Sequence, residues 1–252
     1  MTSAASILRT QIEATLANRI PGALTPRPRI LPETISTGIA ELDAKSIGIP
    51  RGSLTEICGP ASSGRTTLLL SLMRNVTQNG ECCALIDTSN AFDPLSAAAN
   101  RVSLKRLLWA KCAQRHPKLS APDKALKATD IIINAGGFGL IVLDLADVEA
   151  HVARKIPLTS WYRFSRAVES TSTAFVVLEQ QSCAKSCASL VITLLRGVSE
   201  WIPTLSQSQN PKLLTGASLE VGITRSRLEP IQERKPPGHA VVSFRAATPW
   251  AG

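Results

Sequence analysis

The stretch GPASSGRTT, residues 59–67, constrains the fold of this chain more than any other feature. It follows SLTEIC, residues 53–58, in which apolar residues alternate as in a strand, and it precedes LLLSLM, an apolar run typical of a helix. A loop with glycines at both ends in this context matches the phosphate-binding pattern G-x-x-x-x-G-K-[ST], except that Arg65 stands where the pattern has lysine. The sequence therefore predicts a strand–loop–helix unit of the phosphate-binding kind.

The positions of this loop suit a nucleotide with its magnesium ion. The two glycines permit backbone angles that are closed to other residues, so that loop amides can converge on phosphate at the positive end of the helix. The altered residue is longer and flatter than lysine and prefers a forked contact on an outer face of phosphate. We expect ATP binding to be retained and hydrolysis to be weakened; the alternative is a loop that only caps the helix. The predicted nucleotide contacts are Gly59, Ser62, Ser63, Gly64, Arg65, Thr66 and Thr67.

Strand and helix patterns alternate over most of the chain. Strand patterns at 81–87, 106–112, 139–145 and 173–180 are separated by helical patterns, and three strand patterns after residue 188 have no helix between them. This order predicts an α/β fold with a mostly parallel central sheet, helices on both faces and antiparallel strands at one edge. Residues 1–32 are expected to form a helix and a proline-rich linker, and residues 33–252 a core domain.

A second element of the phosphate site is LIVLDL, residues 140–145. A carboxylate at the end of a buried strand can hold Mg²⁺ through its water shell, although an aspartate there can also cap a turn. Because the phosphate loop is present, we predict that Asp144 and Thr66 are the metal ligands.

Several stretches, in their order along the chain, resemble the RecA recombinase family over roughly residues 33–230. This resemblance implies a RecA-like core in which Asp144 and Gln180 take part in catalysis, Gln180 by sensing the γ-phosphate. It also implies that Asp93 contacts adenine, and that Arg225 and Arg227 reach across a subunit interface to the nucleotide of a neighbour. The stretches are ETISTGIAELDA (33–44), RGSLTEICGPASSGRTTL (51–68), CALIDTSNAFDP (83–94), LIVLDL (140–145), VVLEQ (176–180) and SLEVGITRSRLEP (218–230).

The chain also departs from this family, first of all in the lysine of the phosphate loop. Ser89 stands where the family has the glutamate that polarises the attacking water, and Ser96 replaces the aromatic residue that stacks on adenine. A serine cannot act as a general base at neutral pH without a partner. The segment QSCAKSCA, 181–188, is much shorter than the family's glycine-rich loop that grips single-stranded DNA. If the chain is instead an active, DNA-stimulated filament ATPase, Glu179 or Asp87 must replace the missing glutamate.

Reduced RecA paralogues of the ImuA type resemble this chain in length, shortened loops and basic character. They act with a Y-family-like partner and a polymerase in damage-induced mutagenesis. The resemblance implies an accessory or scaffold role in SOS-type lesion bypass, with a RecA filament or lesion-bypass polymerase components as protein partners and possible homo-oligomers.

The net charge is +9, and eight of the basic residues lie between positions 101 and 127, where Asp123 is the single acid. This basic cluster is either a solvated face or a patch for the DNA backbone or an acidic partner, of which we favour the patch. Its members are Arg101, Lys105, Arg106, Lys111, Arg115, Lys118, Lys124 and Lys127.

No apolar run reaches the ~20 residues that span a bilayer, and the first residues lack the apolar core of a signal peptide. We therefore expect a cytoplasmic protein without membrane contact, whose six cysteines are reduced. Trp161, Phe164 and Val168 share one helical face, and we interpret this stripe as core packing rather than a surface for stacking bases.

Overall fold

The computed structural model describes residues 4–16, 32–44, 48–113, 119–195, 199–203, 212–226 and 242–247. The chain divides into two compact units, Met1–Leu31 and Pro32–Gly252. The first unit contains α1 (Ala4–Leu16), on which Ile7, Leu8 and Ile12 are exposed. The assignment of residues 1–32 and 33–252 as domains stays a prediction.

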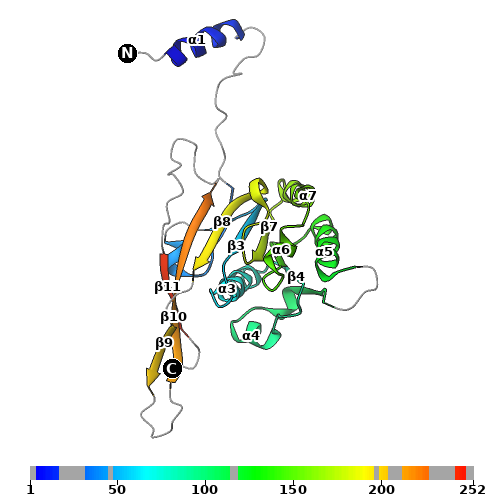
Figure 1. Ribbon diagram of the computed structural model, residues 1–252, viewed down its shortest axis with the longest axis vertical. Coiled ribbons are helices and arrows are strands. Elements are labelled where there is room, and N and C mark those ends of the chain that lie inside the picture. The colour runs from blue at the N-terminus through cyan, green and yellow to red at the C-terminus, as the bar shows by residue number, and fades with distance from the viewer. Residues whose placement is uncertain are drawn as a thin grey trace. The chain divides into compact units, whose positions relative to one another are not determined.

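The second unit is organised around one large sheet. Among its described residues nine strands join this sheet, in the order β11-β10-β8-β3-β7-β6-β4-β5, with β9 paired to β10 (Figure 1). The run from β8 to β5 is parallel throughout, while β9, β10 and β11 are antiparallel to their neighbours. The predicted α/β fold, with a mostly parallel sheet and antiparallel edge strands, is confirmed. The strands are β3 (Ser53–Cys58), β4 (Cys83–Asp87), β5 (Leu107–Lys111), β6 (Leu140–Asp144), β7 (Ala174–Glu179), β8 (Ala188–Leu195), β9 (Ser199–Pro203), β10 (Lys212–Ser226) and β11 (Val242–Ala247).

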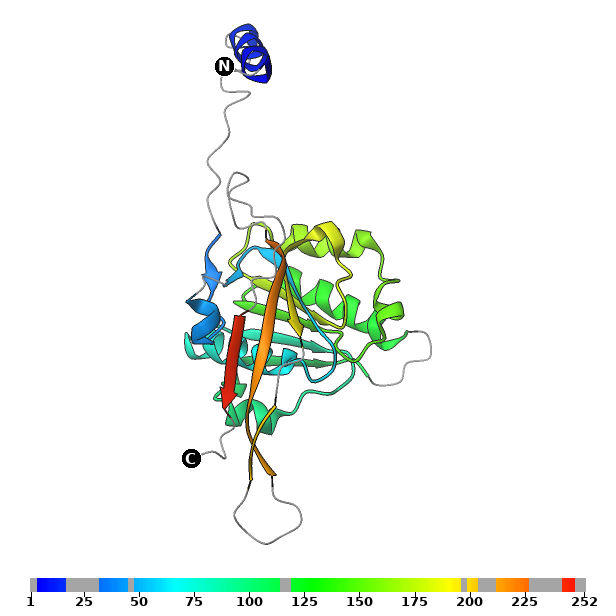
Figure 2. The same ribbon diagram turned by 60° about the vertical axis from the view of Figure 1, so that its left-hand side comes forward.

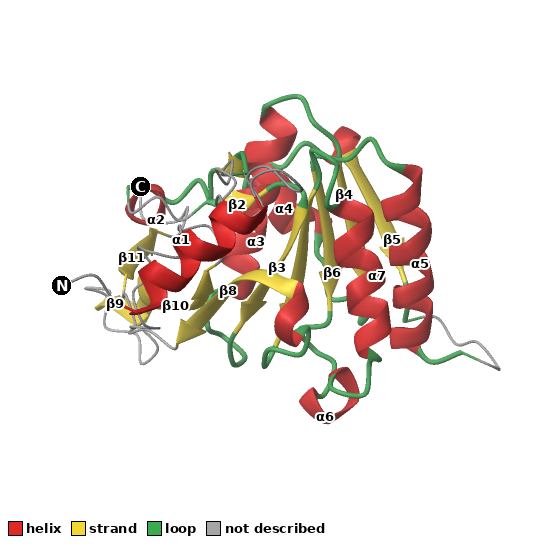
Figure 3. Ribbon diagram, turned by 90° about the horizontal axis from the view of Figure 1, so that it is seen from above, coloured by secondary structure: helices red, strands yellow, loops and turns green. Residues whose placement is uncertain are grey.

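Helices cover both faces of this sheet, as Figure 3 shows from above. On one face, α3 packs Leu68, Leu72 and Met73 against alternate residues of the strands. On the other face lie α5, α6 and α7, and there Trp161 and Phe164 are fully buried, which confirms that their stripe is core packing. The helices of this unit are α2 (Ala40–Asp43), α3 (Arg65–Gln78), α4 (Pro94–Ala99), α5 (Ala121–Ala135), α6 (Ala150–Ala153) and α7 (Leu158–Val168).

The direction of β8 differs from the expectation that the late strands are antiparallel. β8 is antiparallel to β10, but it runs parallel to β3, with Ala188 beside Leu54 and Thr193 beside Cys58. The physical reason is the path of residues 180–187, which return the chain from the end of β7 to the beginning of β3. The long strand β10, orange in Figure 2, then pairs with β8, β9 and β11.

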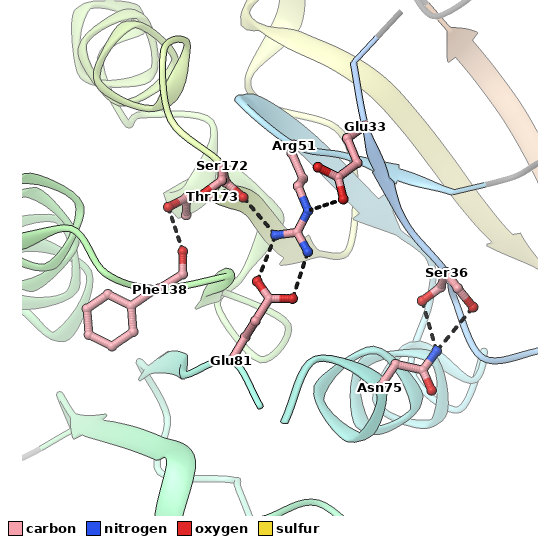
Figure 4. Close-up of polar contacts among 8 residues, drawn as sticks. All are labelled: Glu33, Ser36, Arg51, Asn75, Glu81, Phe138, Ser172 and Thr173. Atoms are coloured by element: carbon pink, nitrogen blue, oxygen red, sulfur yellow. Dashed lines mark hydrogen bonds and ion pairs between the residues drawn. The ribbon is translucent and has the colours of Figure 1, made fainter. Parts of the chain in front are cut away.

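At the amino-terminal edge of the sheet, Arg51 contacts three other segments of the chain (Figure 4). Its guanidinium donates two hydrogen bonds to the Glu81 carboxylate, at 2.9 and 2.7 Å, and one to the carbonyl of Ser172 at 2.7 Å. The same group lies 3.7 Å from the carboxylate of Glu33, just before the small antiparallel pair β1 (Thr34–Ile35) and β2 (Ile49–Pro50). These contacts join the segment that enters the core to the sheet.

No helix among the residues that the structure describes is both long and apolar enough to cross a membrane.

Candidate nucleotide-binding site

The carboxyl-terminal ends of β3, β7 and β6 lie next to each other, and this edge carries the predicted site. Cys58 on β3 pairs with Glu179 on β7, and Leu178 on β7 pairs with Asp144 on β6. Parallel strands end at a common edge, so the phosphate loop, Gln180 and Asp144 are brought together there. Ligands of open α/β sheets bind at this kind of edge.

The loop between β3 and α3 has backbone angles that suit an anion. Gly64 has a φ of 89°, and Ser62, which is not a glycine, has a φ of 62°. A Cβ atom on Gly59 would lie 2.5 Å from the carbonyl oxygen of Leu194, so the close approach of the two backbones requires glycine there. Thr66 and Thr67 are exposed in the first turn of α3.

Ser63 supplies a test of whether this loop fits a phosphate group. Its side chain is 1% exposed, and its Oγ has no hydrogen-bond partner among the described residues. A buried hydroxyl without a partner costs free energy that a phosphate oxygen would offset. The left-handed backbone and the amides at the start of a helix are the other parts of such a site. The loop therefore fits the phosphates of a nucleotide, and Thr66 and Asp144 would hold its Mg²⁺.

Arg65 does not extend into solvent beside the loop. It is 7% exposed, although the two residues that follow it are exposed, and its Nη1 donates a hydrogen bond of 3.4 Å to the carbonyl oxygen of Ala146. The guanidinium thus crosses from the start of α3 to the turn that follows β6.

Asp144 is the last residue of β6, and its carboxylate contacts the turn that follows this strand. Its Oδ1 accepts a hydrogen bond of 2.9 Å from the amide of Ala146. Burial raises the pKa of Asp144 to about 6; the charges of Asp87 and Asp147 add to this rise, while the amide and Arg65 oppose it. A bound divalent cation would favour the ionised carboxylate and so lower this pKa. The aspartate caps the turn and is also placed to hold a metal at the sheet edge, so both predicted interpretations are compatible with its position.

Gln180 follows β7, is exposed, and donates from Nε2 to the carbonyl oxygen of Ala146 at 3.2 Å. The peptide of Ala146 therefore contacts three predicted site residues. The sequence could not reveal this, because the contacting atoms belong to the backbone and not to a side chain. The exposed Asp147 in the same turn was not predicted either, and its charge contributes to the raised pKa of Asp144.

Other predicted site residues lie apart from this cluster. Asp93 caps α4: its carboxylate accepts from the amides of Leu95 and Ser96, each at 3.0 Å, and from the hydroxyl of Ser96, and these bonds lower its pKa. Its contact with adenine stays a prediction. Arg225 is exposed on β10 and donates to the carbonyl of Lys185. Arg227 lies outside the described residues, so the predicted arginine pair stays a prediction as well.

The two acids that were candidates to replace the missing glutamate have other partners. Asp87 is fully buried, and its carboxylate accepts from the amides of Ala91 and Phe92 and from the indole Nε1 of Trp109, at 3.1 to 3.2 Å. Glu179 is fully buried and, by the alternation along β7, faces the helices α5 and α7 rather than α3. Glu179 is therefore turned away from the face that carries α3, and the carboxylate of Asp87 is engaged by three donors.

Glu179 belongs to a buried network below this edge. It contacts Glu56 of β3 and accepts from the amide of Cys183 at 3.2 Å, and it also accepts from the thiols of Cys183 and Cys58. Burial and the neighbouring Glu56 raise the pKa of Glu179 to about 9, so it is protonated at neutral pH. Glu56 accepts three further bonds, from Ser182 Oγ at 2.6 Å, from the amide of Cys183 at 2.8 Å and from the amide of Ala184 at 2.5 Å. These hydrogen bonds hold residues 182–184 against β3.

The basic cluster of residues 101–127 is described in part. Arg101, Lys105, Arg106 and Lys111 are exposed on and just before β5, the outermost strand on that side of the sheet. The ammonium of Lys111 lies 3.8 Å from the centre of the Trp109 ring, a cation–π contact. Lys127 is exposed on α5, whereas Arg115 and Lys118 lie outside the described residues.

A mostly parallel sheet, a glycine-bounded loop between β3 and α3, and an aspartate at the end of the buried strand β6 place this chain in the class of α/β domains with a phosphate loop. The family model described as the RecA N-terminal domain matches residues 10–156, which is more than half of the chain. The chain therefore belongs to the RecA family.

Curated relatives agree with this assignment. The chain is similar to "Protein RecA" of Rickettsia canadensis (strain McKiel), Rickettsia bellii (strain RML369-C) and Rickettsia prowazekii (strain Madrid E), with 37% identity over 139 residues in each case. The aligned part is 53% of this chain and 38% of each relative, so the chain spans well under two thirds of their length. The family match includes the phosphate loop and Asp144 and begins upstream of residue 33, whereas Gln180 and Arg225 lie beyond it.

Proposed function

We propose that this chain is a RecA-like DNA-repair protein with a degenerate nucleotide site, which binds ATP and Mg²⁺ but hydrolyses ATP weakly or not at all. It acts as an accessory or scaffold protein in SOS-type mutagenic lesion bypass. Membership of the RecA family supports the general class, and the fit of the loop to phosphate supports nucleotide binding.

The proposed loss of hydrolysis rests on which acidic side chains surround the site, what they bond to and which way they face. Ser89 occupies the place of the water-activating glutamate, and a hydroxyl does not accept a proton at neutral pH. Asp87 already accepts from three donors, and Glu179 is neutral and faces the other side of the sheet. Asp147 is exposed in the turn after β6, and its charge acts on Asp144, so it is the acid to test for any residual hydrolysis.

The partners follow from the same proposal. Protein partners in DNA repair, either a RecA filament or lesion-bypass polymerase components, are bound by this scaffold in the cytoplasm. Arg225 and Arg227 support possible homo-oligomers, in which they reach the nucleotide of a neighbouring copy. The exposed cations around β5 supply a contact for the DNA backbone, whose strength falls with added salt.

An ATPase assay with and without single-stranded DNA tests the proposal. We expect wild-type turnover at the background level, equal to that of Asp144→Ala, and no stimulation by DNA, while fluorescent nucleotide is still bound. The double variant Arg65→Lys/Ser89→Glu restores the two altered groups and is expected to gain hydrolysis. DNA-stimulated turnover that disappears in Asp144→Ala would instead establish the alternative, an active recombinase-type filament ATPase, and Asp147→Asn would then show whether this acid substitutes for the glutamate.

Association is measured separately. Sedimentation with preformed RecA filaments, and light scattering of the chain alone with ATP, separate a bound accessory protein from a self-assembling filament. The accessory role predicts co-sedimentation and no long self-assembled polymer. Filament growth of the chain alone, driven by ATP, contradicts it.

A further inference from the structure

The Ala146 peptide is the common partner of three groups from three parts of the chain. Its amide donates to Asp144, and its carbonyl oxygen accepts from Arg65 Nη1 at 3.4 Å and from Gln180 Nε2 at 3.2 Å. Arg65 begins α3 and Gln180 follows β7, so two donors that are 115 positions apart converge on a single backbone oxygen.

This convergence occupies the donors that a third phosphate would need. A third phosphate could use the guanidinium and the amide only by withdrawing them from this carbonyl, which would then lose both of its side-chain donors. Because Arg65 is only 7% exposed, its guanidinium has left the solvent side of the loop for the turn after β6. A third phosphate must draw both donors away from Ala146. A diphosphate can be held by the loop amides and Thr66 without this change.

We infer that the Ala146 carbonyl is an internal competitor of the third phosphate, and that the site consequently prefers a nucleoside diphosphate to the triphosphate. The inference rests on the proposed nucleotide binding and deepens it by naming the form of nucleotide that is bound. The opposite preference would follow from net charge, since a triphosphate carries more negative charge near Arg65. Tighter binding of the diphosphate is therefore a signature of the Ala146 contact.

Titration calorimetry with ADP and with ATP, each with Mg²⁺, measures this preference. We expect wild type to bind ADP about tenfold more tightly, which corresponds to a net loss of about one hydrogen bond when both donors are withdrawn from the carbonyl. Arg65→Lys and Gln180→Ala each remove one of the two contacts to the Ala146 carbonyl that a third phosphate must break, and both move the ratio of the two dissociation constants toward one. Two matched controls keep the wild-type ratio. Arg74→Lys alters an arginine of the same helix that donates to the carbonyl of Gly38 at 3.1 Å, and Gln181→Ala alters the neighbouring glutamine.

The outcomes separate this inference from the proposed function. Equal or tighter binding of ATP by wild type overturns the preference and leaves nucleotide binding intact. Binding of neither nucleotide overturns both.

A second measurement tests the Ala146 contact itself without nucleotide. Thermal unfolding is recorded for Arg65→Ala, Gln180→Ala and the double variant. Since either donor satisfies the carbonyl, the double variant is expected to lose more stability than the sum of the single losses. Strictly additive losses overturn the shared contact.

Discussion

Replacement of Glu179 by glutamine should stabilise the protein relative to wild type, by an amount that grows as the pH rises. The pKa of this buried acid is raised from 4.5 to about 9, so the folded chain keeps a proton that the unfolded chain loses above its ordinary pKa. A raised acid pKa means that stability is greatest at low pH and falls as the pH climbs from 4.5 toward 9. The slope for one proton is about 1.4 kcal/mol for each pH unit.

Glutamine keeps the shape and the donor but does not titrate. Its amide can donate to Glu56 as the protonated carboxyl does, and its carbonyl can accept from the amide of Cys183. Between pH 6 and pH 8 the free energy of unfolding of Glu179→Gln should therefore rise, relative to wild type, by about 3 kcal/mol, which is two pH units of the one-proton slope. Urea unfolding at pH 6, 7 and 8 gives this difference from the midpoints, provided that the slope with urea is unchanged.

Two further variants show whether the proton is correctly assigned. Glu169→Gln is the matched control, because Glu169 is exposed just after α7 and pairs with Arg166 of that helix at 2.6 Å. This variant should keep the wild-type dependence on pH. Glu56→Gln should be destabilised, because an NH2 group would replace one of the two oxygens that together accept from Ser182 Oγ and from the amides of Cys183 and Ala184, at a cost of about 1–3 kcal/mol for each donor left unpaired. Equal pH slopes for wild type and Glu179→Gln refute the reasoning, and a benign Glu56→Gln contradicts the assignment of the proton to Glu179.

Two shorter predictions concern the opposite edges of the sheet. Arg51→Ala should lower the free energy of unfolding by about 3 kcal/mol, because it leaves Glu81 without its forked partner. The control Arg163→Ala breaks the exposed pair with Asp130 and should cost about 1 kcal/mol or less. Equal losses for the two variants in urea unfolding would count against the role of Arg51. Binding of Mg²⁺ with nucleotide should weaken as the pH falls through about 6, where the free Asp144 takes up its proton, and titration between pH 5 and 7.5 should show no such dependence in Asp144→Asn.

Much of the candidate site could be predicted from the sequence because of one geometric rule. Parallel strands end at the same edge, so a glycine-rich loop, an aspartate and a glutamine that each follow an apolar strand must lie near one another. The direction of β8 could not be predicted in this way. Parallel connections take a dozen residues or more and usually contain a helix, so the short segment 180–187 favoured an antiparallel return.

The buried acid pair was also beyond prediction, for a different reason. Glu56 and Glu179 are 123 positions apart, and they meet only because β3 and β7 are neighbours in register. Without the strand order, Glu179 had the appearance of a possible base beside Gln180. With the order known, the alternation of side chains along β7 puts Glu179 and Gln180 on opposite faces.

The segment 181–188 connects the buried acid pair with the question of DNA binding. In the RecA family a longer, glycine-rich loop that grips single-stranded DNA stands at this place, whereas this chain has only eight residues there. Here Ser182, Cys183 and Ala184 are bonded to Glu56, on the same strand that leads into the phosphate loop. Lifting the segment would leave a buried carboxylate without its donors, which costs several kcal/mol. We therefore expect single-stranded DNA to leave nucleotide affinity unchanged, even where the cations around β5 hold the DNA, because the element that would transmit DNA binding to the nucleotide is fixed in the core.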